Sequence, residues 1–166
     1  DYGVCGYKDV KKHKELKNKI DWYNELYLEG LRIKVVIADD GSYQGMIEYG
    51  PGELAHRPVS AKGYLFIQCL FVGFKKEYKK HGFASGLIDE CINEAKEKNL
   101  LGVAVVTRKG SFMVKKEIFL KKDFEIVDRA KPDFELTALQ FEKNSKPPRF
   151  RNLEEQLKPY QKGLYI

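Results

Sequence analysis

The sequence predicts a single α/β domain, and three patterns in its 166 residues carry that prediction. The first is an apolar run, Tyr64 to Val72, in which Gln68 is the only strongly polar side chain. Such a run is typical of a strand buried on both faces. The second is a helical stripe of apolar residues that follows this run after a short basic turn. The third is another apolar run, Leu101 to Thr107, which predicts a second buried strand.

A helix and a hairpin are expected before the central strand. Residues 9–29 are predicted to be helical, because apolar side chains recur at helical spacing at Leu16, Ile20, Tyr23 and Tyr27, and Gly30 suits a C-terminal cap. Residues 31–38 alternate in polarity, which predicts a half-buried strand with its core face formed by Leu31, Ile33, Val35 and Ile37. The Asp-Asp-Gly-Ser turn at 39–42 then leads into an antiparallel partner strand at 44–49.

The central helix follows the basic turn, and its stripe consists of Ala84, Leu87, Ile88, Cys91, Ile92 and Ala95. Asn99 suits its C-terminal cap. After the second apolar strand, Ser111 is placed to cap a helix over residues 112–122. Residues 124–129 and 134–141 are predicted to form a closing pair of strands.

The order strand, glycine-bearing turn, helix has a possible chemical use. A helix N-terminus carries unpaired N–H groups and a partial positive charge, so it attracts anions. Gly82 would allow a phosphate to approach the backbone, and Lys79 and Lys80 would add charged donors. The structural alternative is a turn whose lysines only contact solvent, and the residues by themselves leave both interpretations open.

Lys79-Lys80-His81-Gly82-Phe83-Ala84 resembles the acetyl-CoA pyrophosphate loop of the GNAT N-acetyltransferase superfamily, Arg/Gln-x-x-Gly-x-Gly/Ala, with lysine in the first position. The preceding residues 69–72 resemble the strand of that family whose backbone pairs with the pantetheine arm. The resemblance covers roughly residues 31–141. The segment 47–51 and the C-terminal tail further resemble a bacterial branch whose members can carry a thioredoxin-like domain.

The resemblance implies an acyl-CoA N-acyltransferase fold, of α/β (α+β) class, with a central mixed but mostly antiparallel sheet flanked by helices. It also implies that the strand at 101–107 splays from its neighbour to admit the cofactor, with acetyl-CoA as co-substrate and no metal. The cofactor-binding residues it implies are Leu70, Phe71, Val72, Lys79, Lys80, His81, Gly82, Phe83, Ala84 and Ser85.

In this superfamily an amine attacks the thioester directly, so a base must take a proton from the amine. The candidates are Glu48, Tyr49 and His56, of which the last lies in a loop, residues 50–63, that could contribute to an acceptor pocket. The family's usual general acid is a tyrosine, and Phe119 occupies its place, four residues before an aspartate that replaces glycine. Two alternatives therefore remain: a non-catalytic acyl-CoA-binding module and, less favoured, a basic nucleic-acid-binding domain.

Composition sets further limits. The net charge of +6 suits an anionic partner such as CoA or nucleic acid, although the aromatic residues fall mostly in apolar strands rather than among exposed lysines. The three cysteines have no metal-ligand spacing, which favours a reducing cytoplasm. No apolar run is long enough to span a membrane. Residues 1–142 are expected to form the acetyltransferase domain, and 143–166 a linker or extension that could begin a second domain. The expected acceptor is a small-molecule or peptide amine.

Overall fold

The structure is a computed structural model that describes residues 16–73, 82–110 and 114–152. Within these ranges, six strands form one sheet in the spatial order β1 (Arg32–Ile37), β2 (Tyr43–Pro51), β4 (Tyr64–Val72), β5 (Gly102–Arg108), β7 (Phe134–Gln140) and β6 (Glu125–Ala130). The β4–β5 pairing is parallel and the other described pairings in this sheet are antiparallel. The expected α/β fold with a mixed, mostly antiparallel sheet is confirmed.

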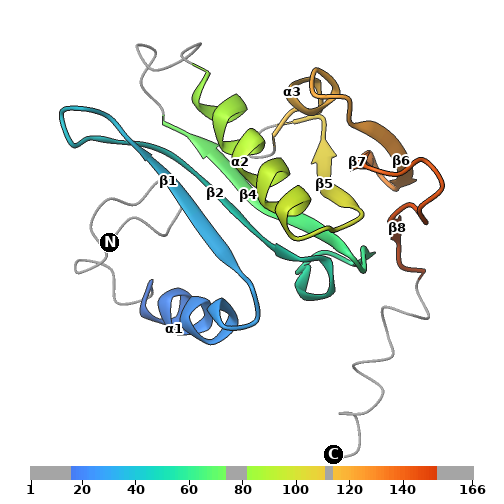
Figure 1. The fold of residues 1–166 in the computed structure, drawn as a ribbon, viewed down its shortest axis with the longest axis horizontal. Helices are drawn as coiled ribbons and strands as arrows, with labels where there is room; N and C mark the ends of the chain where they lie inside the picture. Colours follow the sequence, from blue (N-terminus) through green and yellow to red (C-terminus); the bar gives the residue numbers. More distant parts are fainter. Residues whose placement is uncertain (1–15, 74–81, 111–113, 153–166) are drawn as a thin grey trace, which may run out of the picture.

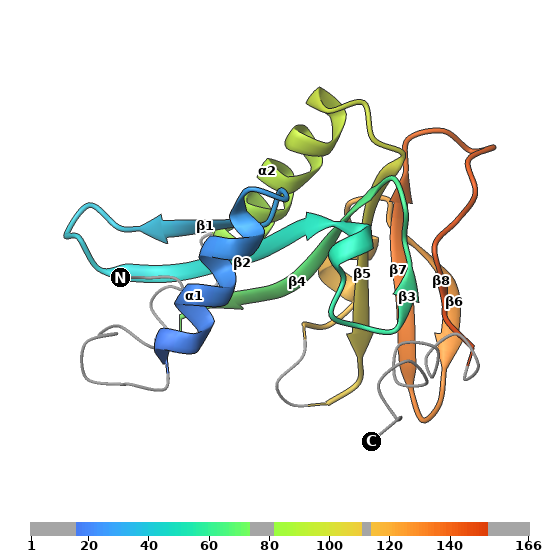
Figure 2. The same ribbon diagram turned by 90° about the horizontal axis from the view of Figure 1, so that it is seen from below.

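The helices of the described residues are α1 (Leu16–Tyr27), α2 (Phe83–Glu97) and the single-turn α3 (Glu117–Leu120). Helix α2 lies across one face of the sheet, over β2, β4 and β5 (Figure 1). A short 3-10 helix, η2 (Gly52–Leu54), and strand β3 (Val59–Ser60) follow β2. Strand β3 pairs with β8 (Arg149–Phe150), so this part of the C-terminal segment lies against the domain (Figure 2).

Two hydrophobic clusters fill the two faces of the sheet. The cluster under α2 combines the buried helix residues Leu87, Ile88, Cys91, Ile92 and Ala95, as the stripe predicts, with strand residues such as Ile67 and Val105. The cluster on the opposite face is built from alternate strand residues, including Phe66 and Val106, and is closed by β3 and Phe150. Residues 66 and 67 therefore point to opposite faces, as adjacent strand residues do.

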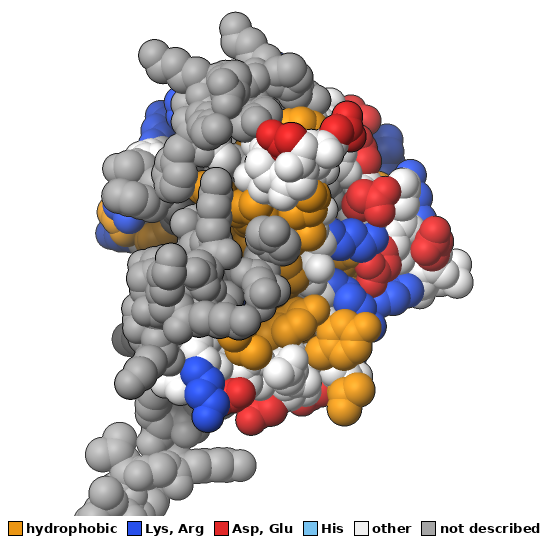
Figure 3. Space-filling view, turned by 90° about the vertical axis from the view of Figure 1, so that its left-hand side faces the viewer, with side chains coloured by type: hydrophobic (Ala, Val, Ile, Leu, Met, Phe, Trp, Pro, Cys, Tyr) orange, Lys and Arg blue, Asp and Glu red, His pale blue; other side chains and the backbone are white. Residues whose placement is uncertain are grey.

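Two expectations need correction. The expected helix at 112–122 is described only as the single turn α3, and Ser111 lies outside the described residues. In β1, Leu31 is buried but Val35 and Ile37 are 38% and 42% exposed, while Val36 packs on the core below α2. Strand β1 is a sheet edge, and the side of the molecule that carries α1 and β1 shows hydrophobic side chains next to a band of charged ones (Figure 3).

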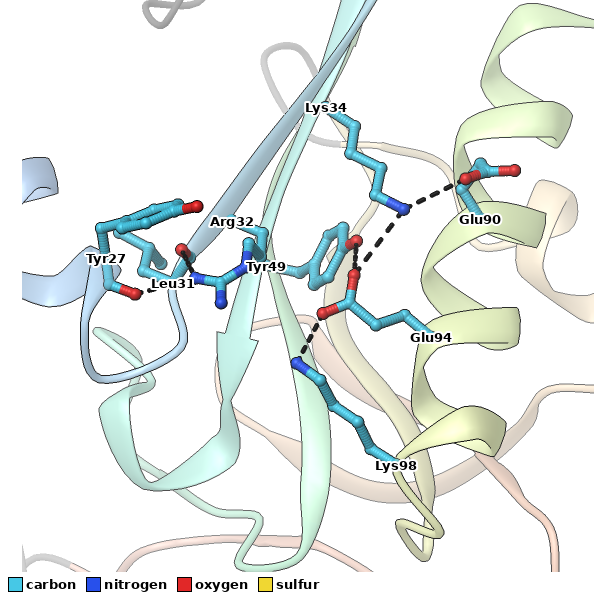
Figure 4. A network of polar contacts seen from close by, with 8 residues as sticks. All are labelled: Tyr27, Leu31, Arg32, Lys34, Tyr49, Glu90, Glu94 and Lys98. Atoms are coloured by element: carbon cyan, nitrogen blue, oxygen red, sulfur yellow. Dashed lines mark hydrogen bonds and ion pairs between the residues drawn. The ribbon is translucent and has the colours of Figure 1, made fainter.

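The side of β1 that carries Lys34 faces helix α2 because of a polar network, which consists of Lys34, Tyr49, Glu90, Glu94 and Lys98. The Tyr49 hydroxyl donates a 2.5 Å hydrogen bond to Glu94 Oε2 on α2, and Lys98 Nζ lies 2.6 Å from the other oxygen, Oε1 (Figure 4). Lys34 lies 3.1 Å from a carboxylate oxygen of Glu90 and 3.7 Å from Glu94 Oε2. Helix α2 thus contacts β1 and β2 through its acidic face as well as through its apolar stripe.

The network determines the charge state of its members. Burial raises the pKa of Tyr49, and the hydrogen bond to Glu94 raises it further, so the phenol stays protonated. Burial also acts to raise the pKa of Glu94, but hydrogen bonds from Lys98 and Tyr49 outweigh it and hold that pKa below its ordinary value. Glu94 is therefore an anion at neutral pH, with three donors around it.

We expect Tyr49→Phe to lower the free energy of unfolding by about 2 kcal/mol, because it removes one donor from the half-buried Glu94 carboxylate and leaves a buried ring without its hydrogen bond. Urea unfolding at pH 7 measures this change. The matched control is Tyr23→Phe on α1, a half-buried tyrosine outside the network, for which we expect a change under about 0.5 kcal/mol. Equal effects of the two substitutions would contradict the role of the hydroxyl.

Candidate active site

The two parallel strands at the centre of the sheet, β4 and β5, separate after a short paired stretch, as the family resemblance implies. Strands β4 and β5 pair over four positions, from Tyr64 opposite Gly102 to Ile67 opposite Val105. Strand β4 then continues to Val72, paired only with β2 among the described residues. Among the described residues, no strand pairs with the second half of β4 on its β5 side. An edge of this kind can pair with an extended ligand.

A cavity of about 150 Å³ lies where the strands separate. Its lining combines apolar side chains from β4 and β5 with Gln68, Cys69 and Arg57, the last from the loop before β3. Val114, ahead of α3, lines it on another side. A second hollow lies along α3 and is lined by Val114, Lys115, Glu117, Ile118 and Lys121. Val114 lines both hollows, so they adjoin at that residue.

A β-bulge at Gln68 shapes the cavity. Glu48 pairs with Cys69 and the next residue of β2 pairs with Ile67, so Gln68 is the extra residue on β4. A bulge interrupts the ladder and redirects side chains, and bulges are frequent beside active sites. The Gln68 amide N–H donates to the carbonyl oxygen of Leu54 at 3.0 Å, and Gln68 Oε1 accepts from the backbone N–H of His56 at 3.2 Å.

The same oxygen of Gln68 fixes the state of the His56 ring. Because Gln68 uses its N–H group on Leu54, its Oε1 faces His56 Nδ1 as an acceptor, so Nδ1 is the protonated nitrogen. In the neutral ring this leaves Nε2 with a free lone pair, which is what a general base requires. Gln68 therefore selects the tautomer in which His56 can accept a proton.

The charges around His56 favour the neutral ring. Burial lowers the pKa of His56 from its ordinary value near 6.5; the hydrogen bond to Gln68 acts against this, and the neighbouring Arg57 guanidinium lowers the pKa further. Glu48 raises the pKa and Lys19 lowers it. The balance is a lowered pKa, so His56 is predominantly neutral at pH 7.

The other two candidate bases are engaged elsewhere. Glu48 is 4% exposed and forms a 2.7 Å ion pair with Lys19 of α1. Tyr49 is fully buried, faces α2 and donates to Glu94. Phe119, at the usual position of the acid, is fully buried against Phe124, with ring centroids 5.4 Å apart. It has no proton to give.

At the other end of the central strand, helix α2 begins with an open turn. Gly82 is its N-cap residue, with φ of 78°, a left-handed conformation that suits glycine. A Cβ built on Gly82 would meet no atom of the described residues within 4 Å. Phe83, Ala84 and Ser85 form the first helical turn, and the N–H groups at the start of a helix point out of its N-terminal end. The predicted cofactor residues Lys79, Lys80 and His81 lie outside the described residues.

Two residues that the sequence analysis did not assign to the site prove to line it, Gln68 and Arg57. Gln68 carried a signal, since it is the single strongly polar side chain in an apolar strand. Arg57 carried none, because an arginine between histidine and proline in a loop has no pattern to distinguish it.

Among the described residues there is no cluster of three or more His, Cys, Asp or Glu side chains suited to a metal ion, and no helix long and apolar enough to cross a bilayer.

Comparison with known proteins supports the resemblance. No protein-family model matches the chain. The chain is 31% identical over 122 residues to the uncharacterized N-acetyltransferase YoaP of Bacillus subtilis (strain 168), an alignment that covers 72% of this chain and 48% of YoaP. The chain therefore spans about half the length of this relative.

Solved structures similar to this one include an acetyltransferase of the GNAT family from Staphylococcus aureus Mu50, which aligns with a TM-score of 0.59 at 15% identity over 78% of this chain and 80% of its own. At such identities the likeness shows the fold alone. The acetyltransferase YncA of Salmonella typhimurium, solved with acetyl-CoA, aligns with a TM-score of 0.59 at 15% identity over 79% of this chain and 76% of its own. The PaiA N-acetyltransferase of Thermoplasma acidophilum, solved with coenzyme A, aligns with a TM-score of 0.57 at 17% identity over 82% and 81%. The ribosomal-protein-alanine N-acetyltransferase of Brucella melitensis aligns with a TM-score of 0.58 at 17% identity over 76% of this chain and 78% of its own.

The tautomer of His56 is directly measurable. We expect long-range ¹H–¹⁵N NMR spectra to show the Nδ1–H form for the neutral ring and a pKa below 6.5, with His56→Gln identifying the signal. Gln68→Leu removes the acceptor and should convert the ring to the Nε2–H form. A wild-type ring already in the Nε2–H form would contradict the role given to Gln68.

Proposed function

From its GNAT acyltransferase fold and its likeness to an N-acetyltransferase, we propose that this chain transfers an acetyl group from acetyl-CoA directly to a primary amine. The observation that carries the proposal is the separation of strands β4 and β5 beyond Ile67 and Val105. A cavity lies where the two strands separate. The separation leaves a length of β4 with no described strand on its β5 side and a partly enclosed reaction site close to His56, whose ring is neutral. The acceptor is a small-molecule or peptide amine.

In this proposal the second half of β4 and the first turn of α2 bind different parts of acetyl-CoA. The backbone of Leu70, Phe71 and Val72 pairs with the amide groups of the pantetheine arm, in place of the missing strand. The open turn of Gly82–Ser85 receives the diphosphate, because helix N–H groups and the helix dipole favour anions there. Lys79, Lys80 and His81, by the family resemblance, supply further donors.

His56 is the base in this proposal, and the chemistry balances without an acyl-enzyme. Acetyl-CoA supplies an activated carbonyl carbon bonded to a good leaving group, the thiolate. His56 Nε2 takes the proton that the amine loses as its lone pair forms the new C–N bond and the C–S bond breaks. We assign the stabilisation of the carbonyl oxygen, as it gains charge, to backbone N–H groups of β4 at the bulge, where the ladder with β2 is interrupted.

One observation favours a second candidate function. Phe119 replaces the usual acid and is buried in the core, which fits a module that binds acyl-CoA without turning it over. The two functions differ in one measurement, the release of free CoA in the presence of amines. Binding of acetyl-CoA with no release above the enzyme-free rate, across a broad set of amines, would favour the non-catalytic module.

The phosphate-binding turn is tested by substitution of its glycine. We expect Gly82→Val to weaken acetyl-CoA binding at least about tenfold, because the side chain fills the space left for a phosphate and disfavours the left-handed backbone. Calorimetric titration measures the affinity. The matched control is Gly86→Ala one turn later, also with open space around its Cβ, which should leave the affinity within about twofold. Unchanged binding by Gly82→Val would contradict the assignment.

The base is tested through the pH dependence of the rate. A base must be deprotonated to act, so kcat/KM should rise with pH through the pKa of His56, which lies below 6.5 because burial and Arg57 disfavour the charged ring. We expect His56→Gln to lower kcat/KM about 100-fold at pH 7, to abolish this acidic limb, and to leave acetyl-CoA affinity unchanged. A retained limb in the variant would exclude His56 as its source.

A further inference from the structure

One charged side chain lines the reaction cavity without a role in donor binding or proton transfer. Arg57 lies in the loop between η2 and β3 and contributes to the cavity beside Gln68 and Cys69. It is half-buried, and its charge acts on the ring of His56. The guanidinium is therefore close to the place where an acceptor amine would lose its proton.

The positive charge of Arg57 is not compensated from within the described part of the protein. No ion pair or side-chain hydrogen bond between described residues involves its guanidinium. The carboxylate that acts on the neighbouring His56 is that of Glu48, and it is held by Lys19 at 2.7 Å. The polar groups of Gln68 are used on Leu54 and His56. The rest of the lining is apolar apart from the thiol of Cys69.

A half-buried cation in such a lining gains most from an anion that arrives with a ligand, because burial of an unpaired charge is costly. The guanidinium fork matches carboxylate and phosphate oxygens in two parallel hydrogen bonds. The donor's phosphates are not that anion, because the proposed phosphate turn at Gly82 follows the far end of β4, beyond Val72. The anion must therefore belong to the acceptor.

We propose that Arg57 selects acceptor amines that carry an anionic group, a carboxylate or a phosphate, a few bonds from the amine. This inference rests on the proposed acetyltransferase function and names its acceptor class. The amine lies at His56 and the anion at the adjacent Arg57, so amino acids and short amino-acid-like amines fit better than simple alkylamines. Arg57 acts as a specificity residue, since it holds the acceptor and takes no part in the bond changes.

The test compares matched acceptors in the wild type and in variants, with free CoA release as the readout. The acceptors are the common amino acids, their amides, which lack the carboxylate, and O-phosphoethanolamine against ethanolamine for the phosphate. The variants are Arg57→Ala, Arg57→Lys, and Lys62→Ala as control, an exposed lysine five residues away that does not line the cavity. Acetyl-CoA affinity is measured in parallel by calorimetry.

We expect the wild type to prefer the anionic member of each pair. In assays at about pH 8, where the His56 ring is neutral with or without Arg57, Arg57→Ala should reduce kcat/KM for that member about 10- to 100-fold, mainly through KM, and leave the neutral member within about twofold. Arg57→Lys should restore part of the loss, because it keeps the charge without the fork. Lys62→Ala and the affinity for acetyl-CoA should not change. The pair with the larger preference, carboxylate or phosphate, identifies the anion.

Two outcomes would overturn the inference, and they are distinguishable. An active wild type with no preference within the pairs, or an Arg57→Ala variant that loses neutral and anionic acceptors equally, refutes the role of Arg57 and leaves the acetyltransferase intact. Acetyl-CoA binding without CoA release for any amine refutes the proposed function, and the inference falls with it.

Discussion

The limited pairing of β4 with β5 is the constraint on which the rest of this structure depends. Parallel strands that stay in register satisfy every backbone group, and these two do so only from Tyr64 to Ile67. Beyond that point the described strand pairings join β4 only to β2 and β5 only to β7. The bulge at Gln68 lies at the point of separation, so the break in the sheet and the polar side chain that orients His56 arise together.

The Tyr49–Glu94 network supports this arrangement from the other side of the sheet. It joins β1 and β2 to the C-terminal half of α2 through the half-buried Glu94 carboxylate, with donors from Tyr49, Lys34 and Lys98. The apolar stripe of α2 packs on the strands beneath it, but apolar packing is not directional. The hydrogen bonds and ion pairs are directional, so they favour one rotation of the helix about its axis.

Much of the fold could be predicted from the sequence, because its strongest patterns are ones that packing enforces. The apolar run of β4 and the stripe of α2 appear where expected, since the first half of β4 and the stripe from Leu87 to Ala95 are buried. The predicted core face of β1 was wrong, because alternation alone does not say which face of a strand a helix will cover. Lys34 forms ion pairs with Glu90 and Glu94 of α2, so its side of β1 faces that helix. Gln68 stands out as a polar residue in an apolar strand, but its role depends on a bulge that the sequence does not predict. The role of Arg57 depends on a loop that folds back over β4, and this residue has no local signature in the sequence.

Under the proposed function, the second half of β4 also limits which thioesters suit the site as donors. From Gln68 to Val72 the strand advances four residues, or roughly 13 Å at about 3.3 Å per residue. The pairing with β2 and the packing of α2 on the sheet hold that length constant. A thioester with a short arm would fill the cavity but would not reach along β4 to the first turn of α2, and would gain none of the binding energy proposed there. Such a scaffold would discriminate donors by the length of the carrier as well as by the acyl group that it delivers.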